Sequence, residues 1–313
     1  MHERPHITPA PVRLTIRKEG RVQYAPPLPT LPPKKRRGGG LWKGSLVVIG
    51  AMLLTTLASK ASDSFHISDA LLLAGTGRST EVLRCPPEMV YVPTSLGGFC
   101  IDRYEVTTGL TCPRVHPSSD MQTNENLAIA TCKPESVKGK DPWVNASLSQ
   151  AMALCARAGK RLPAPGEWYR AALGTPDTVN GGKSGCVLGR VGVSQAELSG
   201  VHDGCVSSFG AYDMVGNVWE WVDANVVDGT LNGHPLPTEG YITEADTDGV
   251  PVQTAATSSA IFGDDYLFLD PNSVRGMFRG GFWNLTDKAG IFTINATIQP
   301  SFAGSAVGFR CVK

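Results

Sequence analysis

The eight cysteines are the residues of this chain with the widest scope for chemistry: metal binding, nucleophilic catalysis or disulfide formation. None belongs to a Cys-x-x-Cys pair, and no group of cysteine and histidine has the spacing of zinc ligands. An even number of cysteines without metal spacing favours disulfides, and disulfides indicate an oxidising compartment. Proximity along the chain suggests three pairs and leaves Cys155 and Cys311, although on the order of 100 pairings exist for eight cysteines. The three suggested pairs are Cys85 with Cys100, Cys112 with Cys132, and Cys186 with Cys205.

Two weaker patterns could also form a catalytic or metal site. His202 and Asp203 stand beside Cys205, but a cysteine in an exported domain of paired cysteines is more often bridged than nucleophilic. The acidic stretch Glu244–Gly249 begins like a calcium loop. Its twelfth position is Ala255, where a calcium loop needs a bidentate glutamate, so a solvated loop is favoured.

Two helices are predicted between residues 147 and 174. Ser147 and Gln150 form a capping-box pair at the start of the first helix, and Gly159 is placed to end it. Pro165 stands at the first position of the second helix, which Gly174 ends. These helices belong to a folded domain that is rich in loops.

Strand patterns precede the helices. Residues Met89–Pro93 and Gly97–Thr107 read as extended segments, so the folded domain is expected to span 85–313 after a linker at 61–84. After Gly174 the chain is punctuated by glycines, and we expect turns and covalent ties rather than long elements to hold it.

Charge divides the chain into two unlike parts. Residues 1–44 carry ten Lys and Arg, two Glu and eight Pro, a net charge of +8, and are predicted to be a disordered basic arm. The remaining residues have a net charge of −7. This acidic body argues against nucleic acid as a partner.

An uncharged segment follows the basic arm. Residues 45–58 contain no charged side chain, and five bases lie just before them. By the positive-inside rule the bases stay cytoplasmic and the main domain is exported to the periplasm or cell surface. A stretch of fourteen residues suits a signal peptide better than a span of about 20, yet a 44-residue leader is unusually long. We favour an uncleaved transmembrane anchor at 45–60 over a removed signal peptide; a buried core helix is disfavoured by the flanking bases.

Several motifs together resemble one family. They are EMVYVP, GGFCIDRYEVT, QAMALCARAGKRLPAPGEW, GAYDMVGNVWEWV, FRGGFWN and GFRCVK, in that order along the chain. The chain resembles the formylglycine-generating enzyme (FGE), or sulfatase-modifying factor, domain over Cys85–Lys313, with insertions at Pro113–Asp141 and Asp223–Ser273. This resemblance implies an irregular, disulfide-stapled α+β fold related to C-type lectins. It also implies a disulfide between Cys155 and Cys311.

The catalytic chemistry of that family is not expected here. Its oxidase uses two cysteines after the RGG motif to bind copper(I), and the matching positions are about Leu285 and Gly290. No Cys, His or Met lies between Met277 and Cys311 to replace them as a soft ligand. Relatives that use iron need a histidine set, and no histidine after residue 60 forms a His-x-x-x-His or His-x-Glu pair.

A structural calcium ion is implied by the resemblance. Carried over residue by residue, Asp213 and Glu220 would supply carboxylates, and Gly216 and Val218 would supply carbonyl oxygens. The alternative is that the two carboxylates only brace the turn. Arg279 and Arg310 could bind a carboxylate in a cleft, but bracing of loops is favoured for both.

The function that these observations favour is binding. We expect an anchored, extracytoplasmic module of the cell envelope that binds a protein or peptide. Residues 282–300 are its expected surface, with Trp283, Asn284 and Asp287 in contact with the partner. The alternatives are an enzyme of the same superfamily with different chemistry and an oxidase with displaced cysteines.

Overall fold

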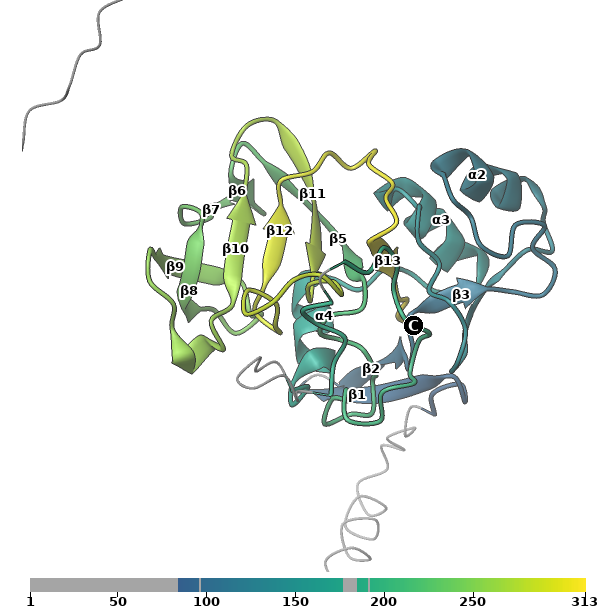
Figure 1. Cartoon of the computed structure of the whole chain (residues 1–313), viewed down its shortest axis with the longest axis horizontal. Helices are drawn as coiled ribbons and strands as arrows, with labels where there is room; N and C mark the ends of the chain where they lie inside the picture. The colour runs from purple at the N-terminus through teal and green to yellow at the C-terminus, as the bar shows by residue number, and fades with distance from the viewer. Residues whose placement is uncertain (1–83, 96, 177–184, 191) are drawn as a thin grey trace, which may run out of the picture. The chain divides into compact units, whose positions relative to one another are not determined.

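The structure is a computed structural model that describes residues 84–95, 97–176, 185–190 and 192–313 (Figure 1). Its first elements are β1 (Met89–Thr94) and β2 (Gly97–Asp102), which pair antiparallel and bring Cys100 opposite Tyr91. Both predicted strand segments are confirmed, although the second is interrupted after Asp102. The chain resumes as β3 (Val106–Thr108), which pairs with β4 (Pro134–Ser136) instead.

Among the described residues, three helices precede the main sheet: α2 (Asp120–Ala128), α3 (Leu148–Arg157) and α4 (Pro165–Ala172). The capping box of Ser147 and Gln150 is present at α3, and Pro165 occupies the start of α4, so both predicted helices are confirmed. Helix α2 was not predicted. It lies within the first insertion and buries only Thr123 and Asn126, so its sequence has no apolar face to reveal it.

The main sheet has nine strands among the described residues, in the order β7, β6, β5, β11, β12, β10, β8 and β9, with β13 paired parallel to β5. All of them follow Gly174, where turns and covalent ties rather than long elements were expected; a sheet of mostly short strands holds this part instead. Most of these strands are too short to show a period of two, and the first four residues of β5 are buried on both faces. The strands are β5 (Trp219–Val227), β6 (Thr230–Leu231), β7 (His234–Pro235), β8 (Gly240–Ala245), β9 (Pro251–Ala255), β10 (Tyr266–Leu269), β11 (Val274–Arg279), β12 (Ile294–Ala296) and β13 (Val307–Phe309).

The second insertion, Asp223–Ser273, contains the whole of β6 to β10. These strands form the part of the sheet drawn at the left of Figure 1, and α2 and α3 lie at the right. A short 3₁₀ helix, η2 (Ala260–Phe262), lies between β9 and β10. The insertion therefore extends the sheet rather than forming a separate loop.

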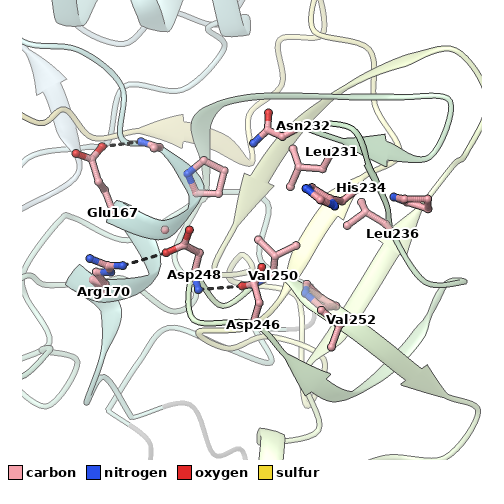
Figure 2. A pocket seen from close by; sticks show the side chains of 15 residues that line it. Glu167, Arg170, Leu231, Asn232, His234, Leu236, Asp246, Asp248, Val250 and Val252 are labelled. Carbon is pink, nitrogen blue, oxygen red and sulfur yellow. Dashed lines mark hydrogen bonds and ion pairs between the residues drawn. The ribbon is translucent and has the colours of Figure 1, made fainter.

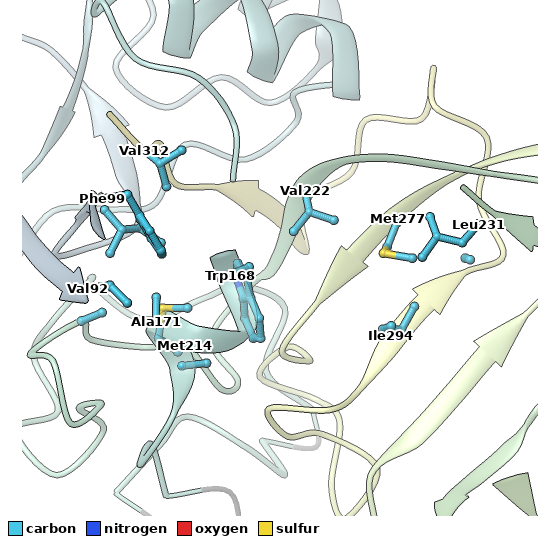
Figure 3. Close-up of a cluster of buried hydrophobic side chains, with 14 of the residues drawn as sticks. Val92, Phe99, Trp168, Ala171, Met214, Val222, Leu231, Met277, Ile294 and Val312 are labelled. Atoms are coloured by element: carbon cyan, nitrogen blue, oxygen red, sulfur yellow. The ribbon is translucent and has the colours of Figure 1, made fainter. Parts of the chain in front are cut away.

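Two large apolar clusters stabilise this arrangement. The first joins the β1–β2 hairpin to α4 and the sheet, and Figure 3 shows Trp168 between Val92 and Val222. The second packs α3 against β5 and β13, around the fully buried Trp221 and Phe309. Burial of such side chains contributes on the order of 2 kcal/mol each.

All eight cysteines form disulfides, and the pairs are those that the sequence suggested. Cys155 with Cys311 joins α3 to the end of the chain across 156 residues. This pair confirms the connection implied by the family resemblance. The local pairs are Cys85 with Cys100, Cys112 with Cys132, and Cys186 with Cys205.

The described residues contain no helix long and apolar enough to cross a membrane. The predicted arm at 1–44, the predicted anchor at 45–60 and nearly all of the linker at 61–84 lie outside the described residues. The described residues belong to one unit, Glu81–Lys313.

We expect the disulfides to stabilise the domain unequally. The Cys155–Cys311 bridge closes a loop of 156 residues and the Cys85–Cys100 bridge one of 15. Loss of the first (Cys155→Ala with Cys311→Ala) should lower the free energy of unfolding by about 5 kcal/mol. Loss of the second (Cys85→Ala with Cys100→Ala) should lower it by about 3 kcal/mol. Urea titrations of the two variants measure both values, and equal losses would contradict this loop-length argument.

Candidate functional site

Strand β11 is followed by two glycines that turn the chain into loop 282–293. Gly280 and Gly281 have φ values of +91° and +92°, which favour glycine. A Cβ atom on Gly280 would lie 2.6 Å from the backbone oxygen of Met214, and one on Gly281 would lie 2.5 Å from the Cβ of Ala289. Close packing therefore fixes the direction in which this loop leaves the sheet.

Two positions of this loop, Leu285 and Gly290, carry no metal-binding side chain. Leu285 is partly buried and packs against the second apolar cluster. A Cβ atom on Gly290 would overlap Oδ1 of Asp265, a fully buried side chain whose Oδ2 accepts a hydrogen bond from the N–H of Phe292 at 2.7 Å. Residue 290 therefore has no room for a larger side chain.

Arg279 is fully buried and joins three segments. Its guanidinium lies 5.3 Å from the ring centroid of Trp168 and donates only to backbone carbonyls among the described residues. Burial lowers the pKa of Arg279 to about 10, so the side chain remains charged at neutral pH. These contacts agree with the loop-bracing role favoured from the sequence. The accepting carbonyls belong to Pro165, Asp248, Gly249 and Ile291, at 2.6 to 3.3 Å.

Arg310 and Glu220 form a buried ion pair. The Nε of Arg310 donates to both oxygens of Glu220, at 2.9 and 2.7 Å, and Nη2 donates to Oε1 at 2.5 Å. The indole N–H of Trp168 donates to Oε2 at 2.6 Å. Burial alone would lower the pKa of Arg310, but the Glu220 carboxylate raises it overall. Each oxygen of Glu220 thus accepts two hydrogen bonds.

Two further buried carboxyl groups lie near this pair. Glu105 accepts hydrogen bonds from the hydroxyl of Ser199 and the amide of Asn217, both at 2.7 Å. Burial, together with the charges of Asp213 and Glu220, raises the pKa of Glu105 well above its ordinary value. Burial also raises the pKa of Asp213, to about 6. The interior therefore holds more carboxyl groups than the cations near them can neutralise.

Of the four residues expected to bind calcium, the two carboxylates, Asp213 and Glu220, already accept hydrogen bonds from other groups. Asp213 has a φ of 55° and accepts a hydrogen bond from the N–H of Gly200 at 2.6 Å. Glu220 already accepts two donors at each oxygen, so a calcium ion would have to displace Arg310 or Trp168. The described residues also include no group of three or more His, Cys, Asp or Glu side chains that could hold a metal.

The expected ligand surface is corrected at one of its three residues. Trp283 is only 4% exposed, packs with Val187 and Val218, and donates its indole N–H to the carbonyl of Val193. It is therefore a core residue, whereas Asn284 and Asp287 are exposed. From the sequence alone, an aromatic residue after RGG could be either a core residue or a contact residue, because both kinds of position favour aromatic side chains.

The pattern of His202, Asp203 and Cys205 does not form a nucleophile. Cys205 is bridged to Cys186, and His202 lies 2.6 Å from a carboxylate oxygen of Glu197. Asp203 is exposed and pairs with Lys138 at 2.8 Å. The preference for a disulfide over a catalytic cysteine is confirmed.

A cavity of about 800 Å³ opens between the start of α4 and two hairpins of the second insertion (Figure 2). Leu231, Val250 and Val252 are among its apolar lining residues, and Arg170 pairs with Asp248 at 3.1 Å beside them. The acidic stretch that resembled a calcium loop is the β8–β9 turn, in which Asp246 accepts hydrogen bonds from the N–H groups of Asp248 and Val250. No pattern in the sequence indicates the cavity, because its walls come together only when the insertion joins the sheet.

Comparison with known proteins identifies a family and gives weak structural likenesses. Residues 70–313 match the family described as "Sulfatase-modifying factor enzyme 1-like domain". No curated protein matches the chain. The chain spans about half of the length of the Major Tropism Determinant variants that it matches. The sequence identities and TM-scores of the matched solved structures are too low to support an argument about function.

Three of the solved structures that match this chain share 15 to 19% sequence identity with it. The Major Tropism Determinant I1 Variant is 15% identical, with 73% of this chain and 52% of that chain covered and a TM-score of 0.39. PvdO from Pseudomonas aeruginosa is 19% identical, with 70% and 82% covered and a TM-score of 0.39. Treponema denticola variable protein 1 is 15% identical, with 73% and 91% covered and a TM-score of 0.36.

The raised pKa of Glu105 predicts a pH dependence of stability. A carboxyl group that keeps its proton in the folded state stabilises that state at low pH, and the contribution is lost as the pH rises through its folded pKa. The free energy of unfolding should therefore fall as the pH rises above about 4.3, by about 1.4 kcal/mol for each unit of pKa shift. Glu105→Gln should flatten this slope in urea titrations made with a chelator present. The exposed Glu244→Gln is the control, and an unchanged slope in Glu105→Gln would contradict the prediction.

The ion pair also predicts the response to calcium. Because Glu220 is saturated by Arg310 and Trp168, excess calcium should leave the Tm of chelator-treated protein unchanged. Thermal unfolding with and without calcium measures this. A rise in Tm that Asp213→Asn abolishes would instead show that the ion binds at this turn.

Proposed function

Because the chain belongs to the sulfatase-modifying factor enzyme 1-like family, we propose that it is a binding module that keeps the family scaffold without its copper chemistry. The observation that carries this proposal is the pairing of all eight cysteines. Copper(I) is held by soft thiolate ligands, and a cysteine in a disulfide offers none. A cysteine displaced in the sequence therefore cannot take over the metal site while the bridges are intact.

The loop after the RGG motif supports the same proposal. The resemblance aligns Leu285 and Gly290 with the two cysteines of the oxidase. Leu285 packs against the core, and Asp265 closes the space beside Gly290. At these two positions the loop is therefore packed against the core and against Asp265.

The proposed location is the outer side of a membrane. Four disulfides favour an oxidising compartment. The uncharged segment at 45–58, preceded by a basic arm, supports an anchor at 45–60 with the arm in the cytoplasm. The exported domain would then face the cell envelope.

The proposed partner is a protein or peptide of the envelope. Asn284 and Asp287 are exposed on loop 282–293, where side chains can change without disturbing the core. The cavity beside Leu231 and Val250 offers a second place for an apolar group. These two surfaces can be separated by mutation because they involve different segments.

A crosslinking experiment with the full chain in its membrane tests this proposal. Asn284→Ala with Asp287→Ala should reduce the yield of the envelope-protein adduct at least about tenfold, the range of a contact hot spot. The Tm should stay within a degree or two of the native value, because both side chains are exposed. The matched variant Met121→Asp changes a side chain of helix α2 that is 67% exposed and lies on neither surface, and it should leave the adduct unchanged.

The same preparation tests for residual catalysis. Incubation with copper and a Cys-x-Pro-x-Arg peptide should yield no aldehyde, because no free thiol is present. Formation of the aldehyde, or an adduct that survives the double substitution, would overturn the proposed function.

A further inference from the structure

We propose that the rings of Tyr241, Tyr266 and Phe268 form a binding site for a cationic side chain of the partner, and that Lys288 fills this site when no partner is bound. We name these three rings the aromatic box. The proposal rests on the proposed function, since it assigns chemistry to the same binding loop. It goes beyond that function by naming what the partner must present, an arginine or lysine side chain of a peptide.

The strands hold the box in a fixed shape. Tyr266 of β10 lies directly opposite Tyr241 of β8 in the antiparallel register, and their ring centroids are 5.1 Å apart at 88°. Tyr266 and Phe268 alternate along β10 with the buried Leu267 and Leu269. The apolar core therefore fixes one face of β10, and the rings stand on the other face, where each is partly exposed.

Lys288 shows that the box accepts a cation. Its ammonium group lies 3.7 Å from the ring centroid of Tyr266, 5.3 Å from that of Tyr241 and 5.8 Å from that of Phe268. None of the ion pairs between described residues includes Lys288. The attraction therefore comes from the electron-rich ring faces, and such contacts are worth about 0.5 to 2 kcal/mol.

This small energy makes Lys288 replaceable. Its side chain comes from the same loop as Asn284 and Asp287, and it is itself partly exposed. A side chain that gains no ion pair on binding loses little when it returns to water. A ligand cation with better geometry, such as a planar guanidinium that stacks on the rings, can take its place.

Charge favours a cationic peptide as the occupant. The chain after residue 44 has a net charge of −7, so its field attracts basic partners. The hydroxyl of Tyr266 donates to a carboxylate oxygen of Glu239 at 3.3 Å, which places a negative group at the rim of the box. Neither feature would favour an acidic or neutral ligand.

The experiment compares two small probes that differ in charge. Acetyl-arginine amide and the neutral acetyl-citrulline amide are titrated into the full chain in detergent, with binding followed by ligand-observed NMR. Lys288→Gln empties the box and should bind the arginine probe roughly tenfold more tightly than the native chain does. It should show no such gain for the citrulline probe. Lys288→Met, which keeps the apolar stem of the side chain, should behave in the same way if Lys288→Gln unfolds.

Two matched variants complete the test. Tyr266→Leu in the Lys288→Gln background removes the central ring and should abolish the gain. Lys138→Gln removes a lysine that lies 5.6 Å from the single ring of Tyr212 and should cause no change. The proposal is overturned if the emptied box binds arginine and citrulline probes equally, or if the gain survives loss of Tyr266. Failure of the proposed function alone would appear differently, as loss of the protein adduct while the box still prefers arginine.

Discussion

The buried ion pair of Arg310 with Glu220 is the interaction on which the rest of the domain depends. Arg310 comes from the last residues of the chain and Glu220 from the start of β5, and both side chains are at most 1% exposed. Arg310 also donates to the backbone carbonyls of Asp102 and Tyr212. It therefore ties the C-terminus to β2, to the turn before β5 and to the sheet. Removing one partner of such a pair costs about 3 to 5 kcal/mol, because the other charge is left buried.

The Cys155–Cys311 disulfide lies next to this ion pair and acts on the same end of the chain. The disulfide lowers the conformational entropy of the unfolded chain, whereas the ion pair stabilises one arrangement of the folded chain. Their combination explains how a domain rich in glycine and short strands keeps a single structure. The same cysteines that stabilise the fold are all paired in bridges.

The second insertion changes what the scaffold can do. Its strands β8 and β10 bury Ile242, Leu267 and Leu269 in the core, and the alternate positions carry rings that remain partly exposed. One strand thus serves the core and presents an aromatic surface to loop 282–293. The packing of Asp265 against Gly290 also fixes the path of that loop. At this position the loop is packed against the sheet, and the insertion supplies the surface beside it.

The sequence alone determined the family, the helices α3 and α4, the first two strands and the disulfide framework. These depend on local signals, such as the capping box at Ser147, or on motifs whose order survives in the chain. It missed helix α2, which has no apolar face, and most of the sheet, whose strands are too short to show a period.

Side-chain placement was decided by tertiary structure. Trp283 is a core residue, and Glu220 pairs with Arg310. Lys288 contacts three rings that lie 20 to 47 residues earlier in the chain. Local sequence records which groups are present. Only long-range packing decides which of them meet, because each contact depends on segments that are far apart in the chain.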